Sequence, residues 1–377
     1  MKKRILAFVQ LPPPVYGQSL MNKYFIDSKL LNDNFKIRYI GLHYAPAKNK
    51  NKSGLIKKRT FFLNYYFVLF WNLLIFRPHL VYFTISVTGK AFLRDVIFVK
   101  LIKLFRKKIV YHFHNKGIIH YSGKTHLDKL YKLVFKNSYA IHLSSLLYYD
   151  IEKYVPKEKV FFCTNGIPVI DMAQFPKTLK NERPHVLFLS NLIASKGVWI
   201  LLEACTLIKK KKIDFVCDII GDWGDITPKE FNNYINVSEL GDSIKYLGPL
   251  VGEERLQYYS NADIFVFPTF YPNECFPLVI LEAMHFGLPV ISTYEGAIPE
   301  IVDNNKTGFL IRQGSAEELA KQIEILISNP ELREEMGNCA GNKFLEKYTL
   351  GNFENRMKEI LCEILEKSKP AQKTEIV

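Results

Sequence analysis

Short apolar runs alternate with longer helical stretches along nearly all of this 377-residue chain. Strand-like runs occur near residues 4–10, 37–42, 80–85, 108–113, 139–143 and 160–163, and again near 185–190, 215–220, 244–247, 263–267 and 289–292. Helical patterns fill the intervals, as is typical of parallel sheets joined by crossover helices. A chain of this length is long enough for two such domains with separate cores. The sequence therefore predicts a doubly wound α/β fold that occurs twice.

A polar segment from Asp171 to Arg183 is the expected linker between the two halves. It contains Pro176, and few contacts cross such segments. We therefore expect one domain over residues 1–180 and a second over 181–352. Helical patterns over 315–347 and 353–367 follow, and the polar tail from residue 368 predicts disorder.

The two halves carry opposite charge. Residues 1–180 hold 31 Lys and Arg against 8 Asp and Glu, a balance of +23, while the remainder holds 20 against 29, a balance of −9. Such an excess predicts an anionic partner for the first half: anionic lipid head groups, a phosphate-bearing acceptor or nucleic acid. The basic residues are dispersed and show no nucleic-acid motif, so binding of nucleic acid there would be nonspecific and salt-sensitive.

Cysteine usage and apolar runs indicate the compartment. The six cysteines lack metal-site spacing and predict reduced residues of a cytosolic protein. The basic N-terminus precedes about five apolar residues, fewer than the ~7 of a signal peptide, and predicts a first strand. The run from Phe61 to Phe76 has 16 residues and follows Lys57, Lys58 and Arg59. A spanning helix needs roughly 20 residues, so we expect a buried or interfacial helix.

Two glutamates flank the start of an apolar helix. Seven residues separate Glu274 from Glu282; Pro277 suits the first helical position, and an apolar run from Leu278 to Met284 surrounds Glu282. An unpaired buried carboxylate costs several kcal/mol, so Glu282 needs ligand hydroxyls or, alternatively, a lysine from a neighbouring element. The helix start suits a phosphate. Together these features predict a pocket for a phosphate flanked by two hydroxyl-bearing groups, the layout of a nucleotide-sugar.

The stretch from Ser260 to Ile311 resembles the donor-binding half of the retaining glycosyltransferases of family 4, the glycosyl transferases group 1, of the bacterial polysaccharide type. The residues that carry the resemblance are the Glu-x(7)-Glu pattern, Gly-Leu-Pro-Val-Ile-Ser at 287–292 and Glu-Gly-Ala-Ile-Pro-Glu-Ile-Val at 295–302. The resemblance implies the GT-B fold, two Rossmann-like domains that face each other across a cleft. It assigns the acceptor to the first domain, the nucleotide-sugar to the second, and the helix at 353–368 to the first domain.

The resemblance also implies roles in the second domain. Glu282 is expected on the ribose hydroxyls and Glu274 on the hexose hydroxyls. Lys196 and the backbone amides around Pro277, from Phe276 to Leu278, are expected on the diphosphate. Asn191 stands where the family has an arginine, which removes one positive charge from the leaving-group site. Gly221 resembles the family's glycine turn near the nucleotide.

In the first domain two loops are singled out. Gly17 follows three prolines at the start of a helical pattern, where a backbone can approach a phosphate or sugar closely; a plain turn is the equal alternative. His112 and His114 share one face of a strand end, but no third metal ligand is evident and no metal is expected. The resemblance places His114 beside the transferred sugar, after the domains close.

The activity implied is retaining, metal-independent and cofactor-free transfer of a hexose or N-acetylhexosamine from a nucleotide-diphosphate sugar, with a UDP-sugar preferred. The implied acceptor is a glycan or lipid-diphosphate-linked molecule of bacterial capsule or O-antigen biosynthesis, at the cytoplasmic face of the plasma membrane. Alternatives are a nucleotide-sugar epimerase, a nucleic-acid- or membrane-binding non-enzyme, and a non-catalytic partner that keeps the fold. The absence of Gly-x-Gly-x-x-Gly after either first strand argues against a dinucleotide dehydrogenase.

Overall fold

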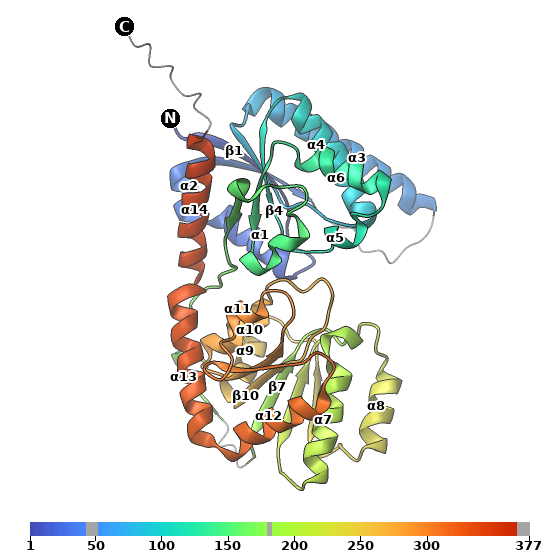
Figure 1. Ribbon diagram of the computed structural model, residues 1–377, viewed down its shortest axis with the longest axis vertical. Helices are drawn as coiled ribbons and strands as arrows, with labels where there is room; N and C mark the ends of the chain where they lie inside the picture. Colours follow the sequence, from blue (N-terminus) through green and yellow to red (C-terminus); the bar gives the residue numbers. More distant parts are fainter. Residues whose placement is uncertain (43–51, 179–182, 368–377) are drawn as a thin grey trace. The chain divides into compact units, whose positions relative to one another are not determined.

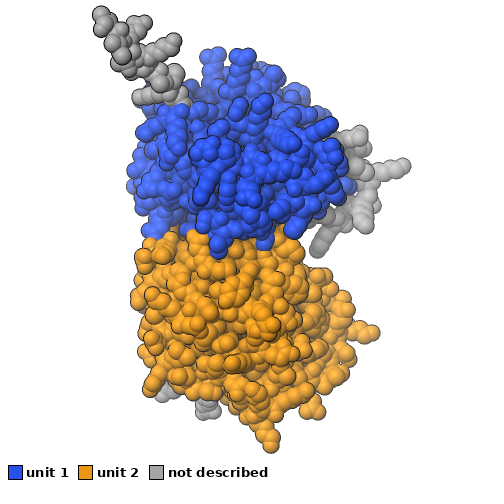
Figure 2. All heavy atoms as spheres, viewed as in Figure 1, with its two compact units in different colours: residues 1–165, 351–377 blue, residues 166–350 orange. Residues whose placement is uncertain are grey.

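The computed structural model describes residues 1–42, 52–178 and 183–367 (Figure 1). The chain divides into two compact units: unit 1 comprises Met1–Asn165 and Gly351–Val377, and unit 2 comprises Gly166–Leu350 (Figure 2). Residues 166–178, which the sequence predicts for the first domain, lie in unit 2. The predicted disordered tail and residues 179–182 of the predicted linker lie outside the described residues.

Unit 1 is built on a six-stranded parallel sheet with the order β2-β1-β3-β4-β5-β6. Its strands are β1 Lys3–Gln10, β2 Phe35–Leu42, β3 Leu80–Phe83, β4 Lys108–His112, β5 Tyr139–His142 and β6 Val160–Phe162. The six strands predicted for the first half are confirmed. Nearly every residue of β1, β3, β4 and β5 is buried, as expected where helices cover both faces of a parallel sheet.

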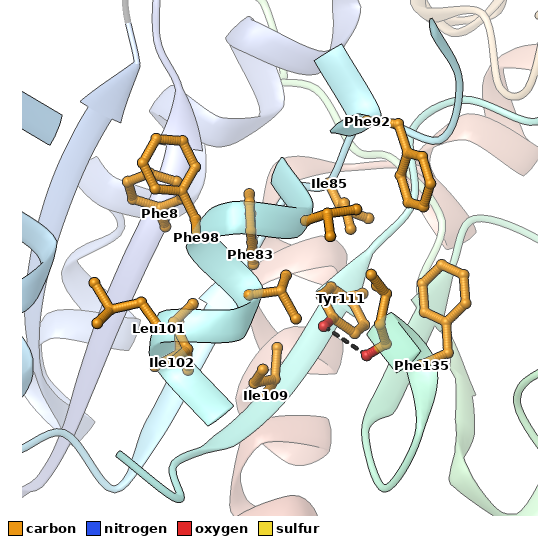
Figure 3. Close-up of a cluster of buried hydrophobic side chains, with 14 of the residues drawn as sticks. Phe8, Phe83, Ile85, Phe92, Phe98, Leu101, Ile102, Ile109, Tyr111 and Phe135 are labelled. Atoms are coloured by element: carbon orange, nitrogen blue, oxygen red, sulfur yellow. Dashed lines mark hydrogen bonds between the residues drawn. The ribbon is translucent and has the colours of Figure 1, made fainter. Parts of the chain in front are cut away.

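The helices of unit 1 are α1 Gly17–Asp27, α2 Lys29–Asn34, α3 Lys52–Trp71, α4 Gly89–Leu104, α5 Ile118–Tyr121, α6 Thr125–Phe135 and α14 Leu350–Glu366. A π-helical turn, Asn72–Phe76, extends α3. An aromatic core fills the space between the sheet and α4, where the rings of Phe8, Phe83 and Phe98 meet at 4.8 to 4.9 Å (Figure 3). Tyr111 completes it and donates its hydroxyl to the Val134 carbonyl at 2.9 Å.

Unit 2 repeats the plan with a six-stranded parallel sheet of order β12-β11-β10-β7-β8-β9. Its strands are β7 His185–Leu189, β8 Val216–Ile220, β9 Ile244–Gly248, β10 Ile264–Phe267, β11 Val290–Thr293 and β12 Gly308–Ile311. Five of these were predicted and are confirmed. The sequence analysis missed β12, because four residues that begin with a glycine resemble a turn more than a strand.

The helices of unit 2 are α7 Val198–Lys210, α8 Pro228–Val237, α9 Glu253–Asn261, α10 Leu278–His285, α11 Ile298–Ile301, α12 Ala316–Ser328 and α13 Pro330–Lys347. The prediction of one helix over 315–347 is wrong, because α12 ends before Asn329 and α13 begins after it. There the Asn329 side chain accepts from the Leu332 N–H at 3.0 Å, and Pro330 opens α13. Proline has no N–H for an intrahelical bond, so it starts a new helix more readily than it continues one.

Strand order reverses direction once in each sheet, between β1 and β3 in unit 1 and between β7 and β10 in unit 2. The loops that leave the carboxyl ends of the two strands beside such a reversal diverge and leave a crevice, where open α/β sheets bind ligands. In unit 2 these are the loops after β7 and β10. None of the described helices combines the length and apolar character required to cross a bilayer.

Candidate active site

The loops at the carboxyl edge of the unit 2 sheet are joined by backbone hydrogen bonds. The Phe270 N–H donates to the Ser195 carbonyl at 2.8 Å and joins the loops after β10 and β7. The Leu192 N–H donates to the Asp222 carbonyl at 2.8 Å and joins the loops after β7 and β8. The site therefore rests on a connected set of loops rather than on independent ones.

Two glycines permit these loops to approach so closely. Gly221 has φ +156°, and a Cβ there would lie 1.8 Å from the Ser190 carbonyl oxygen. Gly197 has φ +91°, and its Cβ would lie 2.2 Å from the Pro268 carbonyl oxygen. Any side chain at either position would force two backbones apart, so glycine is required at both. Gly221 thus forms a glycine turn at the expected place, although its contact with a nucleotide stays a prediction.

Lys196 and Glu274 meet at the β7–β10 reversal. Lys196 ends the short turn after β7, Glu274 lies in the loop after β10, and their side chains form an ion pair. Their side chains are 16% and 11% exposed, so the pair is largely shielded from water. The Lys196 ammonium also lies 4.4 Å from the ring centroid of Tyr271, within range of a cation–π contact. Two of the three predicted catalytic residues therefore lie together.

Glu282 lies on α10, 5% exposed, and the protein itself supplies its partners. Arg255 of α9 forms a bidentate ion pair with its carboxylate, with Nη2 2.7 Å from Oε1. Tyr259, one turn further along α9, donates its hydroxyl to Oε2 at 3.0 Å. Burial and the neighbouring Glu282 carboxylate raise the pKa of Tyr259 well above its usual value, so the hydroxyl stays protonated. The expected role of Glu282 toward a ribose stays a prediction.

Arg255 and Tyr259 are not predicted from the sequence as partners of Glu282. Both lie on α9 at positions i and i+4, which share one helix face. That spacing is the one signal in the sequence that joins them, and it occurs in most helices. From the sequence, a lysine of a neighbouring element is only the alternative to ligand hydroxyls. The partner that the structure shows is an arginine, whose planar fork suits a bidentate contact with a carboxylate.

The start of α10 differs by one residue from the prediction. Pro277 has ψ 120°, which is extended, and the helix begins at Leu278 rather than at Pro277. Phe276 and Leu278 are 5% and 9% exposed, so this approach to the helix is buried. The Ala297 N–H donates to the Cys275 carbonyl at 2.8 Å and holds the approach against the loop after β11.

The loop after β11 packs against the backbone of Glu274. Gly296 has φ +57°, and a Cβ there would lie 2.4 Å from the Glu274 carbonyl oxygen. Glu295, 8% exposed, accepts from the Gly296 N–H at 3.0 Å and from the Gln313 side chain at 2.8 Å. In the sequence, Glu295 and Gly296 stand only within the segment that carries the family resemblance, and no role is predicted for Glu295 or Gln313.

Asn191, the expected substitute for the family's arginine, follows β7 and is exposed. Its carbonyl accepts from the Ile193 N–H at 2.8 Å, which closes the tight turn before Lys196. Residues 190–197, which form the loop after β7, are all described, and Lys196 is the one cationic residue among them.

In unit 1, His112 and His114 lie at the end of β4 with their ring centroids 4.1 Å apart. His142 ends the neighbouring strand β5 and accepts from the Leu143 N–H at 3.0 Å through Nδ1. Burial lowers the pKa of His114 and of His142 to about 3 and that of His112 well below its usual value. All three rings are therefore neutral, and their Nε2 atoms are buried without a hydrogen-bond partner.

This histidine cluster lies at the carboxyl ends of β4 and β5, the edge at which open α/β sheets bind ligands. Among the described residues, no three His, Cys, Asp or Glu side chains converge closely enough to hold a metal ion. Gly17, the other residue singled out in unit 1, is exposed and begins α1 directly after the loop that leaves β1. A shallow hollow lined by Arg4, Phe35 and Lys36 lies at the opposite edge of that sheet, where β1 and β2 start, and is remote from these loops.

Two Rossmann-like units, each with six parallel strands and a strand reversal, constitute the GT-B fold, as the sequence predicts. Residues 170–343 match the family model described as glycosyl transferases group 1. Over these residues the chain is similar to the group 1 glycosyltransferases.

Relatives support the same class. Over 169 residues the chain is 31% identical to the amylovoran biosynthesis glycosyltransferase AmsK of Erwinia amylovora, which covers 44% of this chain and 41% of that protein. It is 28% identical over 169 residues to the D-inositol 3-phosphate glycosyltransferase of Paenarthrobacter aurescens (strain TC1), again covering 44% of this chain and 41% of the relative. The chain thus spans about half the length, or less, of these curated relatives.

A solved structure extends the similarity of fold to both units. The structure of Anabaena HepE in complex with UDP superposes with a TM-score of 0.74 at 18% identity and covers 96% of this chain and 100% of that one. At this level of identity the likeness concerns the fold alone.

Proposed function

We propose that this protein is a retaining glycosyltransferase that moves a hexose or N-acetylhexosamine from a nucleotide-diphosphate sugar to a glycan or lipid-linked acceptor. The proposal rests above all on the Lys196–Glu274 pair at the strand reversal of unit 2. A cation and a carboxylate at that place match the two chemical parts of such a donor: a diphosphate that needs positive charge and a sugar that needs hydrogen-bond acceptors.

In the absence of donor the two charges neutralise each other, which makes the site stable while it is empty. When the donor binds, Lys196 turns toward the diphosphate and Glu274 accepts hydrogen bonds from the sugar hydroxyls. Both side chains are largely shielded from water, so each new contact is stronger than it would be in solvent. The exchange of one ion pair for two ligand contacts keeps every charge in the site compensated.

During transfer, the bond between the anomeric carbon and the diphosphate oxygen breaks, and a bond from that carbon to the acceptor oxygen forms. Negative charge develops on the leaving diphosphate, and the proton of the acceptor hydroxyl passes to an oxygen of that diphosphate. Lys196 and the backbone amides from Phe276 to Leu278 stabilise that negative charge. We propose that His114 donates a hydrogen bond to the transferred sugar, since its ring is neutral and its Nε2 lacks a partner. No metal takes part in this proposal.

The names of similar proteins support a choice of donor and acceptor for this proposal. HepE binds UDP and UDP-glucose, so a UDP-sugar is the donor that we propose. AmsK is named for amylovoran biosynthesis, which supports an acceptor in bacterial surface polysaccharide assembly. The basic first half of the chain favours an acceptor that carries a lipid diphosphate, at the cytoplasmic face of an anionic membrane.

Calorimetric binding of UDP, GDP and ADP in EDTA tests the donor site. We expect micromolar binding of UDP, weakened about tenfold to a hundredfold by Lys196→Met, because one charge-assisted contact to the diphosphate is lost. Lys211→Met is the matched control, since Lys211 also pairs with a glutamate, Glu324, but follows the distant end of α7. Equal affinity in wild type and Lys196→Met would contradict the donor site, and a strict need for Mg²⁺ would contradict metal independence.

Product analysis then separates the proposal from its nearest rival. With UDP-sugars and a lipid-diphosphate-linked acceptor, a transferase extends the acceptor and releases UDP. An epimerase would instead release a sugar isomer and leave the acceptor unchanged. An extended acceptor whose formation is abolished by Glu274→Gln supports the proposal, because that variant keeps the size of the side chain and removes its charge.

A further inference from the structure

The outer face of α3 is apolar although it is exposed. From Thr60 to Phe76 the chain carries no charged residue. Leu69, Leu73 and Phe76 are buried in the core of unit 1, so the inner face of this helix is already covered by protein. The exposed side chains between residues 62 and 76 are Leu63, Asn64, Phe67, Trp71, Leu74 and Ile75, of which Asn64 alone is polar.

These apolar side chains form one stripe. Leu63, Phe67 and Trp71 are spaced by four residues, and Leu74 and Ile75 follow in the π-helical turn, so all lie on one side of the helix. They are 40% to 67% exposed. A helix that is apolar all round is normally covered on both sides, by protein or by lipid. A second partner for α3 is therefore missing from the described chain.

The exposed face of α4 continues this surface with a mixed pattern. Leu93, Ile97 and Leu104 are 47%, 43% and 76% exposed. Lys90 and Lys100 are exposed on the same face, because the five positions follow each other at spacings of three and four residues. Leucine and isoleucine beside lysines on one helix face are typical of helices that lie in a membrane interface.

The two helices present these faces side by side. The rings of Phe62 and Phe98 lie 5.2 Å apart, and those of Phe70 and Phe105 lie 5.6 Å apart, so α3 packs along α4. Figure 1 shows both helices on the same side of the unit 1 sheet. We call the exposed side chains of α3, its π-helical turn and α4 the α3–α4 face.

The segment of the chain that contains α3 and α4 is strongly basic. Between residues 34 and 127 the chain holds 18 Lys and Arg and a single acidic residue, Asp95. Asp95 is buried and paired with Arg94, so it contributes no free negative charge to the face. Each Lys or Arg near an anionic bilayer strengthens binding to it.

We propose that the α3–α4 face docks unit 1 on an anionic lipid bilayer, with the apolar stripe of α3 at the level of the acyl-chain boundary and Lys90 and Lys100 at the head groups. The inference deepens the membrane location of the proposed function, since it assigns that location to named residues. Trp71 lies within the stripe, and tryptophan favours the interface between lipid and water. The face lies on the bilayer and does not cross it.

Vesicle flotation tests the proposal. We expect wild type to float with vesicles of phosphatidylcholine and phosphatidylglycerol and to float much less with phosphatidylcholine alone. Phe67→Gln combined with Trp71→Gln should lower the partition coefficient at least about tenfold, since two large apolar side chains no longer leave water. Lys90→Gln combined with Lys100→Gln should lower it about tenfold on anionic vesicles alone. The matched control, Val237→Gln with Val251→Gln, alters two apolar residues of unit 2 that are more exposed than Phe67 and Trp71, and it should bind normally.

Depth-dependent quenching gives a second readout. In a Trp199→Phe, Trp223→Phe background, Trp71 is the remaining tryptophan, and lipids brominated near the head group should quench its emission. Three results would overturn the proposal: no flotation, flotation that the Phe67 and Trp71 changes leave intact, or a wild-type dimer that these changes dissociate, which would show a second copy on the face. Calorimetric UDP binding by the same variants distinguishes these failures from failure of the donor site, which lies in unit 2.

Discussion

At the scale of single residues, the buried carboxylate of Glu282 depends on Arg255. Replacing Arg255 with methionine leaves that carboxylate, which is 5% exposed, with Tyr259 as its remaining described side-chain donor. Breaking one side of a buried ion pair costs about 3 to 5 kcal/mol, and we expect about 3 kcal/mol here because Arg255 is 23% exposed. Urea unfolding in a Trp71→Phe background, in which the emission comes from Trp199 and Trp223 of unit 2, measures the change.

Two further variants sharpen this prediction. Adding Glu282→Gln to Arg255→Met should restore part of the lost stability, because no uncompensated charge then remains buried. Arg312→Met is the control, since Arg312 and Glu318 form an exposed pair that is worth at most about 1 kcal/mol. An Arg255→Met protein as stable as wild type would show that the buried pair does not contribute to the stability of unit 2.

The histidine cluster predicts a loss of unit 1 stability in mild acid. Folded His114 and His142 bind a proton only near pH 3, whereas the unfolded chain binds it below about pH 6.5. The unfolded chain therefore holds more protons in that window, and the free energy of unfolding falls as the pH drops from 6.5 toward 3. Each histidine contributes a loss of about 2 kcal/mol at pH 5, at about 1.4 kcal/mol per pH unit.

The variant His142→Gln tests whether the free energy of unfolding falls with pH because of this histidine. Between pH 7 and pH 5 it should lose about 2 kcal/mol less than wild type, even if it is less stable at pH 7. Urea titrations read by hydrogen exchange of peptides from β4 and β5 report unit 1 specifically. His126→Gln on α6, an exposed position, should keep the wild-type slope. If both variants keep that slope, protonation of His142 does not limit stability in acid.

The sequence could predict these residues unequally. Glu274 and Glu282 are eight positions apart on one segment, so their spacing alone singled them out. Lys196 lies 78 residues from its partner Glu274, and family resemblance rather than any local pattern pointed to it. Arg255 gave no signal, because an arginine on a polar helix face is ordinary until the fold turns it toward a buried carboxylate.

At the scale of elements, two glycines of α13 make a matched test of helix packing. A Cβ at Gly337 would lie 2.1 Å from the Gly287 carbonyl oxygen, which belongs to the turn after α10. A Cβ at Gly341, one turn later, meets the Met284 carbonyl oxygen at an ordinary 3.6 Å. Gly337→Ala must therefore separate α13 from the turn that follows the helix carrying Glu282.

We expect Gly337→Ala to destabilise unit 2 by about 2 kcal/mol or more, as overpacking of a core does. Gly341→Ala should be neutral or stabilise the unit by up to about 1 kcal/mol, because alanine favours the helix. Thermal unfolding of both variants measures the contrast. Equal effects would mean that α13 shifts freely relative to α10.

Element types followed from the sequence wherever length and periodicity agreed. Eleven of the twelve strands were expected, because buried parallel strands form continuous apolar runs. The three incorrect element predictions all concern the residues at which a helix or strand begins or ends. The glycine at the start of β12 made that strand resemble a turn. The Asn329 cap and Pro330 separate α12 from α13, and the extended ψ of Pro277 moves the start of α10 to Leu278.

At the scale of the whole molecule, the chain order and the compact units do not coincide. The chain leaves unit 1 at Asn165 and returns to it through α14, after unit 2 is complete. Lys108 of β4 donates to the Ile364 carbonyl at 3.3 Å, and Arg356 donates to the Phe162 carbonyl at 3.1 Å. The sequence predicted a final helix over 353–367, but the resemblance to a family, not the pattern, assigned it to the first domain.

This arrangement predicts that a destabilising substitution in α14 lowers the stability of unit 1. Ile360 of α14 is fully buried there, whereas its neighbour Glu359 is exposed. Ile360→Asn should destabilise unit 1 by about 3 kcal/mol or more, through lost apolar burial and a buried amide, while Glu359→Asn should cost less than about 1 kcal/mol. Hydrogen exchange of β4 and β5 should then accelerate in Ile360→Asn alone, while peptides from β7 and β10 and the UDP affinity stay as in wild type. Acceleration in both units would show that they unfold as one body, and the donor site would then depend on a helix that contributes no residue to it.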